Sequence, residues 1–221
     1  MYATNENATI SKNSEYYYFS MSGSIAASGN INTLLKADGS VNNLTGKDFC
    51  YYSMFQDCTA LTQAPELPAT TLADSCYLNM FRECPSLTKA PELPARTLAD
   101  KCYSGMFYRC ESLTQAPELP ATTLAYDCYG WMFAYCTSLT QAPELSATTL
   151  AGHCYESMFY GSGIPSFTVD MTACTSVPIL PDYYLFSFSE KPYTVLVPAS
   201  LYDEWIQTDG WSTLASNIQA V

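Results

Sequence analysis

A 26-residue pattern begins at Cys50 and recurs in four full copies that align without a gap. The first copy reads CYYSMFQDCTALTQAPELPATTLADS, and a fifth copy starts at Cys154 but departs from the pattern after residue 160. Cysteine, methionine, phenylalanine and leucine keep their places in successive copies, whereas the polar residues vary. A period of roughly 20–50 residues with fixed apolar positions is typical of units that bury a core only when they stack. The repeat therefore predicts a stacked array.

The overall composition is that of a folded, acidic protein. Hydrophobic residues make up 48% of the 221 residues, which argues against disorder. With 21 acidic and 9 basic residues, the formal net charge is −12, so the surface repels phosphate backbones and anionic lipids. We therefore expect no binding to nucleic acid. No apolar stretch reaches the roughly 18 residues of a membrane span, and the first residues lack the basic and apolar regions of a secretion signal. Direct membrane insertion is not expected.

Nine of the ten cysteines follow the repeat. Those from Cys50 to Cys154 fall 26 residues apart, as do those from Cys58 to Cys136, and Cys174 belongs to neither column. Many cysteines in a short chain can indicate a disulfide scaffold. A small apolar residue at the same place in every copy also suits the core of a stacked array, and free cysteine is among the most buried residue types. The column spacing favours reduced, buried cysteines over disulfides.

The first part of each copy has helical spacing. Cys76, Met80 and Cys84 are four residues apart, which would place them on one side of a short helix. Asp74 precedes this segment and is a suitable N-cap for the helix. The equivalent N-cap candidates in the other copies are Asp48, Asp100 and Asp127.

The second part of each copy is interrupted by proline. In the second copy, Leu87 to Ala90 suits a strand of about three or four residues, because Pro91 and Pro94 exclude a helix interior and cannot donate to a sheet. We therefore predict an α/β fold with one short strand and one short helix per 26-residue repeat.

The segments on either side of the array are predicted to be caps, which shield the open ends of a repeat stack. Together with the array they should form one structural domain. The predicted segments are a flexible N-terminus at 1–13, an N-terminal cap at 14–49 with a helical turn at NINTLL, the array at 50–160 with four full repeats and a partial fifth, and a C-terminal cap at 161–221.

The C-terminal cap has its own pattern. Residues 193–197 predict a strand that stops at Pro198. A helix should follow that carries Trp205 on its apolar side, and a second short helix should bring Trp211 and Ile218 together.

The motif Met-Phe-x-x-Cys-x-x-Leu, followed by a proline-bounded segment, resembles the BspA-like, or Treponema pallidum-type, leucine-rich repeats. The core of those repeats is Ala-Phe-x-x-Cys-x-x-Leu-x-x-Ile. The resemblance covers residues 50 to 160, and residues 197–211 look like the terminal cap of related gut Bacteroides proteins. This sequence differs in its longer period, in methionine for alanine, and in the double proline of APELP. The matching positions are Phe55, Phe81, Phe107 and Phe133, Cys58, Cys84, Cys110 and Cys136, and Leu61, Leu87, Leu113 and Leu139.

The resemblance implies a leucine-rich-repeat solenoid with N- and C-terminal caps. It also implies a protein at the cell surface, or secreted, that binds or adheres to a partner. A fold alone does not establish such a function.

The positions that vary between copies are candidates for recognition, because the stacked core fixes the others. Exposed tyrosine and tryptophan offer a large, rigid contact area with a polar tip, which suits sugar rings or a protein partner. The same side chains could instead only cover the outer edge of the array. The candidate partner-binding residues are Tyr52, Tyr108, Trp131, Tyr135 and Tyr160.

Catalytic and metal sites find little support in the sequence. The only histidine, His153, neighbours Cys154, but adjacency in sequence is not the geometry of a nucleophile and its base. No cysteine pair has zinc-site spacing, and no glycine-rich phosphate loop is present. A stacked glutamate column could hold a cation, although solvated side chains are the simpler interpretation. That column is Glu66, Glu92, Glu118 and Glu144.

We therefore predict a non-catalytic binding or adhesion module for a protein or glycan partner, with no cofactor and no metal. Two alternatives stay open. One is a structural spacer within a longer surface protein or a phage tail fibre, and the other is an enzyme whose site lies in a cap.

Overall fold

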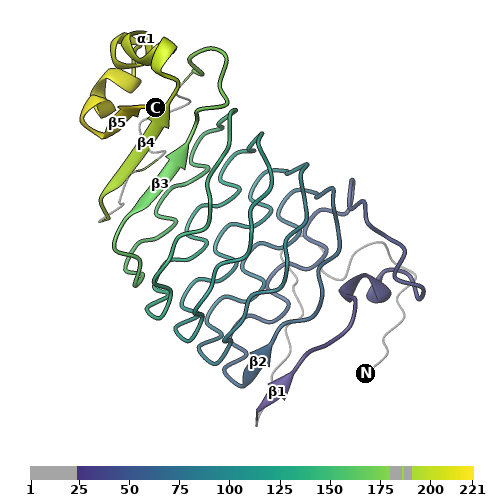
Figure 1. Ribbon diagram of the computed structural model, residues 1–221. Coiled ribbons are helices and arrows are strands. Elements are labelled where there is room, and N and C mark those ends of the chain that lie inside the picture. The colour runs from purple at the N-terminus through teal and green to yellow at the C-terminus, as the bar shows by residue number, and fades with distance from the viewer. Residues whose placement is uncertain (1–23, 180–185, 187–190) are drawn as a thin grey trace.

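A computed structural model describes residues 24–179, 186 and 191–221 (Figure 1). Within these residues the chain is a mixed α/β protein with a few short helices, two small parallel sheets and no closed barrel. No described helix is both long and apolar enough to cross a membrane. The predicted flexible segment 1–13 and residues 14–23 of the predicted N-terminal cap lie outside the described residues.

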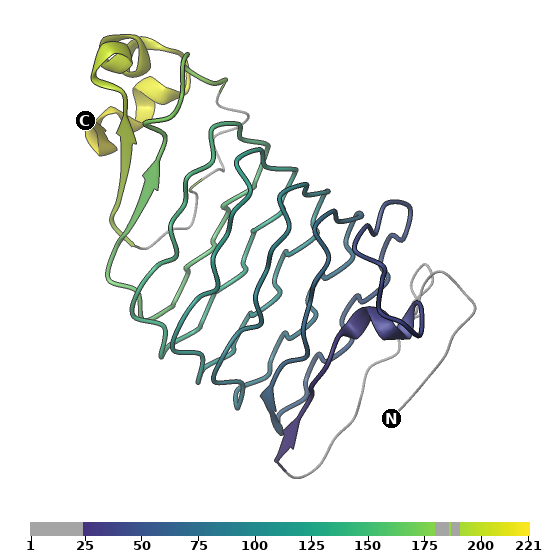
Figure 2. The same cartoon turned by 45° about the vertical axis from the view of Figure 1, so that its right-hand side comes forward.

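The two sheets lie at opposite ends of the repeat region (Figures 1 and 2). One sheet pairs β1 (Ile25–Ala26) with β2 (Leu61–Gln63), and the other has the order β3 (Phe167–Asp170), β4 (Tyr193–Val197), β5 (Ile218–Ala220). All of these pairs are parallel. The described helices are the 3-10 helices η1 (Ile31–Leu34), η2 (Ala199–Leu201) and η3 (Trp211–Asn217), and the α-helix α1 (Tyr202–Gln207).

Successive copies of the repeat lie side by side and are joined by backbone hydrogen bonds. In and just before the second copy, five alternate N–H groups donate to the carbonyls 25 residues later, at N–O distances of 2.7–3.0 Å. The equivalent positions make the same bonds at the other three junctions between copies. These five donors are Ser75, Tyr77, Asn79, Phe81 and Glu83.

The residues between these donors close tight turns. The N–H groups of Cys76, Leu78 and Met80 each donate to the carbonyl three residues earlier, at 3.1–3.3 Å. Every fourth residue has a positive φ, as at Asn79 (55°) and Glu83 (59°). An α-helix needs bonds from residue i to residue i−4 and excludes such left-handed residues. The prediction of a short helix in each copy is therefore wrong, and the segment is a chain of turns.

The helix-like spacing has a physical explanation. The turn unit is four residues long, with two neighbouring residues buried and the next two on the outer side, so Cys76 and Tyr77 are followed by Met80 and Phe81. A helix also brings residues i and i+4 to one side, so the two structures share this spacing. The burial of both members of each neighbouring pair is the difference between them.

The predicted N-cap aspartates act between copies. The Asp74 carboxylate accepts a hydrogen bond from the N–H of Asp100 at 3.2 Å, and the Asp100 carboxylate accepts one from the N–H of Tyr126 at 3.1 Å. The N-cap prediction is wrong for all four aspartates, Asp48, Asp74, Asp100 and Asp127, because no helix follows them in the described repeats. The amide that Asp74 or Asp100 caps belongs to the next copy.

The predicted strand is formed in the first copy alone among the described repeats, where β2 pairs with β1. The equivalent residues of the second copy, Leu87 to Ala90, are not a strand. Pro91 and Pro94 have no N–H to donate, and the nearby bond from Thr114 N to Thr88 O is 3.5 Å long. Copy-to-copy pairing on this side is therefore sparse, and the prediction of one strand per repeat is wrong.

Aromatic columns fill the interior. The tyrosine column runs from Tyr51 to Tyr155 with ring centroids 5.5–6.1 Å apart and planes within 12° of parallel. The phenylalanine column runs from Phe55 to Phe159 at 5.4–6.0 Å and within 13°. These distances correspond to offset stacking, so each ring covers the ring of the next copy.

The cysteine columns are buried and reduced, as the repeat spacing predicts. All ten cysteines are free and buried. In the second column, the Cys84 thiol donates to the carbonyl of Phe55 at 3.0 Å, and Cys110 makes the same contact with Phe81 at 3.1 Å. The column therefore adds a link between copies that a purely apolar side chain would lack.

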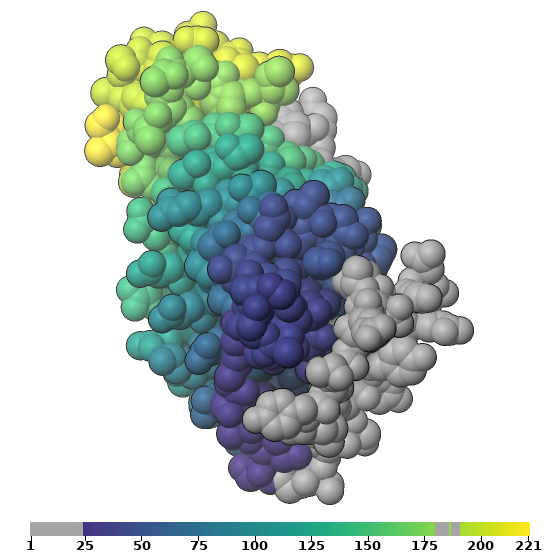
Figure 3. Space-filling view, turned by 90° about the vertical axis from the view of Figure 1, so that its right-hand side faces the viewer, coloured from purple at the N-terminus to yellow at the C-terminus, as the bar shows by residue number. Residues whose placement is uncertain are grey.

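The described part of the predicted N-terminal cap lies against the first copy (Figure 3). Ile31 N donates to Glu66 O at 3.0 Å, and Leu44 N donates to Thr71 O at 2.9 Å. The helical turn predicted at NINTLL is confirmed as η1.

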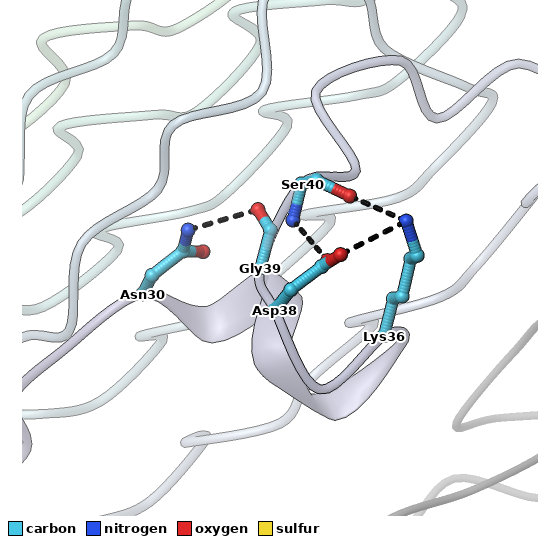
Figure 4. Close-up of polar contacts among 5 residues, drawn as sticks. All are labelled: Asn30, Lys36, Asp38, Gly39 and Ser40. Atoms are coloured by element: carbon cyan, nitrogen blue, oxygen red, sulfur yellow. Dashed lines mark hydrogen bonds and ion pairs between the residues drawn. The ribbon is translucent and has the colours of Figure 1, made fainter.

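A polar turn follows η1 (Figure 4). The Lys36 ammonium contacts the Asp38 carboxylate at 3.1 Å and donates to the Ser40 hydroxyl at 2.7 Å. Hydrogen bonds from Ser40, together with Lys36, lower the pKa of Asp38 to about 2. The Asn30 amide donates to Gly39 O at 3.1 Å, and a Cβ on Gly39 would lie 2.7 Å from that amide nitrogen. Glycine thus permits this close approach.

The predicted C-terminal cap is joined to the fourth copy through β3, because Asp170 N donates to Leu145 O at 2.7 Å. The strand predicted at 193–197 is confirmed as β4, and the helix predicted to carry Trp205 inward is confirmed as α1. Trp205 and Trp211 are fully buried and meet edge to face at 4.5 Å.

The second predicted helix is the 3-10 helix η3, and it ends at Asn217. Placing Ile218 on that helix was wrong, because Ile218 begins β5 and pairs with Val195. A β-branched residue fits this strand position, where it is buried beside β4.

The turn chain predicts an unusual response to glycine at Glu83, which has a positive φ. Glu83→Gly should be more stable than Glu83→Ala by about 0.5–1 kcal/mol, because only glycine adopts this conformation without a steric cost. A helix would give the opposite sign, with glycine less stable by about 1 kcal/mol. Urea unfolding of the two variants measures the difference, and both variants equally remove the ion pair with Arg82. A more stable alanine variant would contradict the turn chain.

The tyrosine column predicts two different outcomes for the same substitution. The Tyr51 hydroxyl donates to the Asn32 side chain at 2.9 Å, whereas the buried Tyr77 hydroxyl has no partner among the described residues. Tyr51→Phe should cost about 1–2 kcal/mol, because a buried acceptor loses its donor, and Tyr77→Phe should be neutral or stabilising. Thermal unfolding compares the two variants. Equal losses of stability would contradict this assignment of the hydrogen bonds.

Candidate partner-binding surface

Four of the five predicted recognition residues form one cluster on the turn side of the array, which is the side formed by the chain of turns in each copy. The ring of Tyr135 lies 5.4 Å from Tyr108 and 5.3 Å from Tyr160, in both cases edge to face. Trp131 lies 6.3 Å from Tyr108 and 5.9 Å from Tyr160, with planes tilted by about 50°. All four side chains are half-buried, so each supports its neighbours and leaves part of its surface open. The structure thus joins positions from three successive copies.

Two arginines complete the cluster. The Arg82 guanidinium lies 3.9 Å from the centre of the Tyr108 ring. The exposed Arg109 guanidinium lies 4.9 Å from the Tyr135 ring and 5.7 Å from the Tyr108 ring. Cations at such distances are attracted to the negative faces of the rings. We call this surface the aromatic–arginine patch, and it consists of Arg82, Tyr108, Arg109, Trp131, Tyr135 and Tyr160.

The arginines were not among the predicted site residues. They occupy the same variable positions as the aromatic residues, since Arg82 aligns with Tyr108, and Arg109 aligns with Tyr135. That alignment was the available signal. The chain contains three arginines, and two of them lie in the patch.

The turn chain positions the patch. Arg109, Trp131 and Tyr135 are left-handed residues with φ of 57–60°, and Ser53 takes the same conformation in the first copy. The backbone strain therefore belongs to the repeat rather than to a site. Gly161 matters more locally, because a Cβ there would lie 2.8 Å from the Tyr135 ring. The missing side chain leaves the space that the ring occupies.

Tyr52 does not join the patch. It lies in the first copy, where its ring packs edge to face against Phe49 at 5.9 Å. The structure therefore groups Tyr108, Trp131, Tyr135 and Tyr160 but leaves Tyr52 apart from them.

The APELP side of the array carries two adjoining grooves. Their volumes are about 800 and 510 Å³, and both are lined by Lys89, Pro91, Glu92 and Pro94. The four predicted column glutamates are exposed. In the described part of the chain, no group of three or more histidine, cysteine, aspartate or glutamate side chains is arranged to hold a metal ion.

The region around His153 is an ionisable cluster. The His153 Nδ1 contacts the Glu156 carboxylate, and its ring packs edge to face against Tyr126 at 5.2 Å. The Asp127 carboxylate accepts a hydrogen bond from the Ser104 hydroxyl at 3.3 Å. Burial raises the pKa of Asp127 from 3.8 to about 6, despite the opposing effects of Lys101 and of the Ser104 bond.

The cysteines offer little nucleophilic reactivity. Cys154 is fully buried beside this cluster, which leaves a substrate no direct path to its sulfur. Burial raises the pKa of Cys58 to about 11 and that of Cys136 to about 12. Thiols in this state are protonated at neutral pH, whereas the thiolate is the nucleophile and metal ligand.

No protein-family model and no curated protein match this sequence. We therefore infer a function from the geometry of the described surfaces.

Asp127 should give the protein a distinct pH dependence. Its folded pKa is raised, so between about pH 4 and pH 6 the folded state holds a proton that the unfolded chain has released, and this contribution to stability falls as the pH rises. At neutral pH the half-buried carboxylate is charged, and burying that charge costs stability. Asp127→Asn removes the charge and keeps a residue that tolerates positive φ. At pH 7 the variant should be more stable by about 1 kcal/mol, after allowance for solvent screening of the partly exposed carboxyl.

Urea unfolding of both proteins at pH 4, 5, 6 and 7 tests this expectation. The stability difference should be smallest at pH 4 and should grow toward pH 7. A difference that stays constant, or that shrinks with rising pH, would show that the carboxyl is not destabilised by burial.

Proposed function

We propose that residues 50–160 form a leucine-rich-repeat solenoid of the BspA-like type, and that the chain is a non-catalytic binding or adhesion module for a protein or glycan at a cell surface. The copy-to-copy backbone bonds and the continuous ring columns support the solenoid, because each copy completes its core with its neighbours. The bonding pattern differs from a repeat with one helix per copy, so this proposal includes a turn chain in place of that helix.

The aromatic–arginine patch carries the binding proposal. Aromatic side chains and arginine are the residue types most enriched where binding energy concentrates. The interior columns account for the conserved pattern of the repeat, but they do not require aromatic residues on the outer turns. Only copies three to five supply the patch aromatics, so the patch is a local feature of an otherwise regular array.

A Trp131→Ala/Tyr135→Ala variant tests the proposal. Pull-downs and glycan arrays with the wild-type chain should identify a partner, and the double variant should bind it at least tenfold more weakly, because two rigid contact surfaces are lost. Tyr52→Ala is the matched control, since it removes a half-buried tyrosine from the same side of the array outside the patch. Circular dichroism should show that the variants are folded.

A partner that binds the double variant and the wild type equally well would refute the role of the patch. Absence of any partner across these screens would instead favour a structural spacer.

A further inference from the structure

The patch combines ring surfaces with positive charge in a strongly acidic protein. Its variable column runs from Asp57 in the first copy through Glu83 to Arg109, Tyr135 and Gly161. The column therefore changes from negative to positive and then to neutral along the array. At the third to fifth copies it contains no carboxylate.

The backbone of the patch cannot recognise a ligand by strand addition. The N–H groups of all six patch residues already donate to carbonyls of their own or the next copy, at 2.7–3.1 Å. An extended peptide that adds to a sheet needs unpaired main-chain groups. The two grooves on the APELP side, and a third of about 460 Å³ near Cys174, are lined by residues outside the patch. Recognition at the patch must therefore use ring surfaces and guanidinium groups.

Resting on the proposed function, we infer that the patch binds an acidic polysaccharide through the anionic group and the ring of its sugar units. In such a sugar, an apolar ring face and a carboxylate or sulfate belong to one rigid unit. The ring face can lie against Trp131 or Tyr135 while the anion reaches Arg109, which is exposed beside the Tyr135 ring. Arginine binds planar anions through two parallel hydrogen bonds.

The overall charge sets the conditions for this binding. A net charge of −12 repels a polyanion at long range, but exposed charges are screened beyond about 10 Å at 0.1 M salt. Contacts within the patch are shorter than that distance. Arg82 is paired with Glu83 at 3.5 Å, whereas Glu83 acts on Arg109 only from a longer distance, and Arg109 is the more exposed of the two arginines, so Arg109 carries most of the recognition.

Affinity measurements with defined polymers test the inference. The probes are polygalacturonate, its fully methyl-esterified form, dextran sulfate and neutral dextran. The wild-type chain should bind polygalacturonate or dextran sulfate, and whichever is preferred identifies carboxylate or sulfate as the anion. The esterified and neutral polymers should bind at least tenfold more weakly, because they lack the charge.

Arg109→Gln should weaken binding to the acidic polymer about tenfold, since it removes a charge-assisted pair of hydrogen bonds. Arg96→Gln is the matched control, because Arg96 is an exposed arginine that lines a groove on the APELP side. It should bind like the wild type. Equal effects of the two substitutions would show non-specific attraction and overturn the inference.

Two further outcomes separate this inference from the proposed function. If the chain binds a neutral glycan or a protein through Trp131 and Tyr135, and Arg109→Gln has no effect, the inference fails and the proposed function stands. If neither acidic nor neutral glycans nor any protein binds, both fail.

Discussion

The rest of the structure depends on how the turn chain divides its backbone hydrogen bonds. Alternate N–H groups close local turns, and those between them donate to the next copy. Each copy is thereby fixed at one offset of 25 residues from donor to acceptor, as in the bond from Tyr77 N to Cys102 O. That offset holds each side chain next to its equivalent in the next copy, and the tyrosine and phenylalanine columns follow from it.

Every copy of the repeat contains left-handed residues, which lower its conformational stability. A non-glycine residue in this conformation costs roughly 1 kcal/mol, yet Asn79, Glu83 and Lys101 all adopt it. The bonds between copies and the burial of the neighbouring Cys-Tyr and Met-Phe pairs offset this cost. Because backbone geometry and core packing meet these requirements, the outward residues are free to vary. The same geometry therefore accommodates aspartate in one copy and tyrosine in another.

The sequence allowed much of the interior to be predicted and little of the local backbone. Repetition identified the buried cysteine columns, and a proline and two tryptophans located the C-terminal strand and helix. The turn chain was missed because Cys76, Met80 and Cys84 have the same spacing in a helix. Positive φ at residues such as Glu83 and the burial of both members of each neighbouring pair separate the two structures, and glutamate gives no signal for a positive φ. The strand near Leu87 failed for a related reason, since pairing between copies is decided by neighbours that one copy does not contain.

The candidate site was predictable to the extent that it lies on varying positions. Those positions gave Tyr108, Trp131, Tyr135 and Tyr160, but the contacts among them depend on the offset between copies. Arg109 was missed because a charged residue on an outer turn is ordinarily a solvated side chain, and its proximity to the Tyr135 ring appears only in three dimensions.

The two sides of the array differ in what they can distinguish. The APELP side repeats nearly the same residues in each copy, with Glu66, Glu92 and Glu118 at equivalent places, so a ligand there would meet the same surface at every step. The turn side changes from copy to copy while its backbone stays constant. Specific recognition requires a surface that differs from its surroundings. Among the variable columns of the described repeats, one changes from carboxylates to arginine and then to an aromatic ring, and it does so from Glu83 to Arg109 and Tyr135. The patch lies at that step, where a regular scaffold presents an irregular surface.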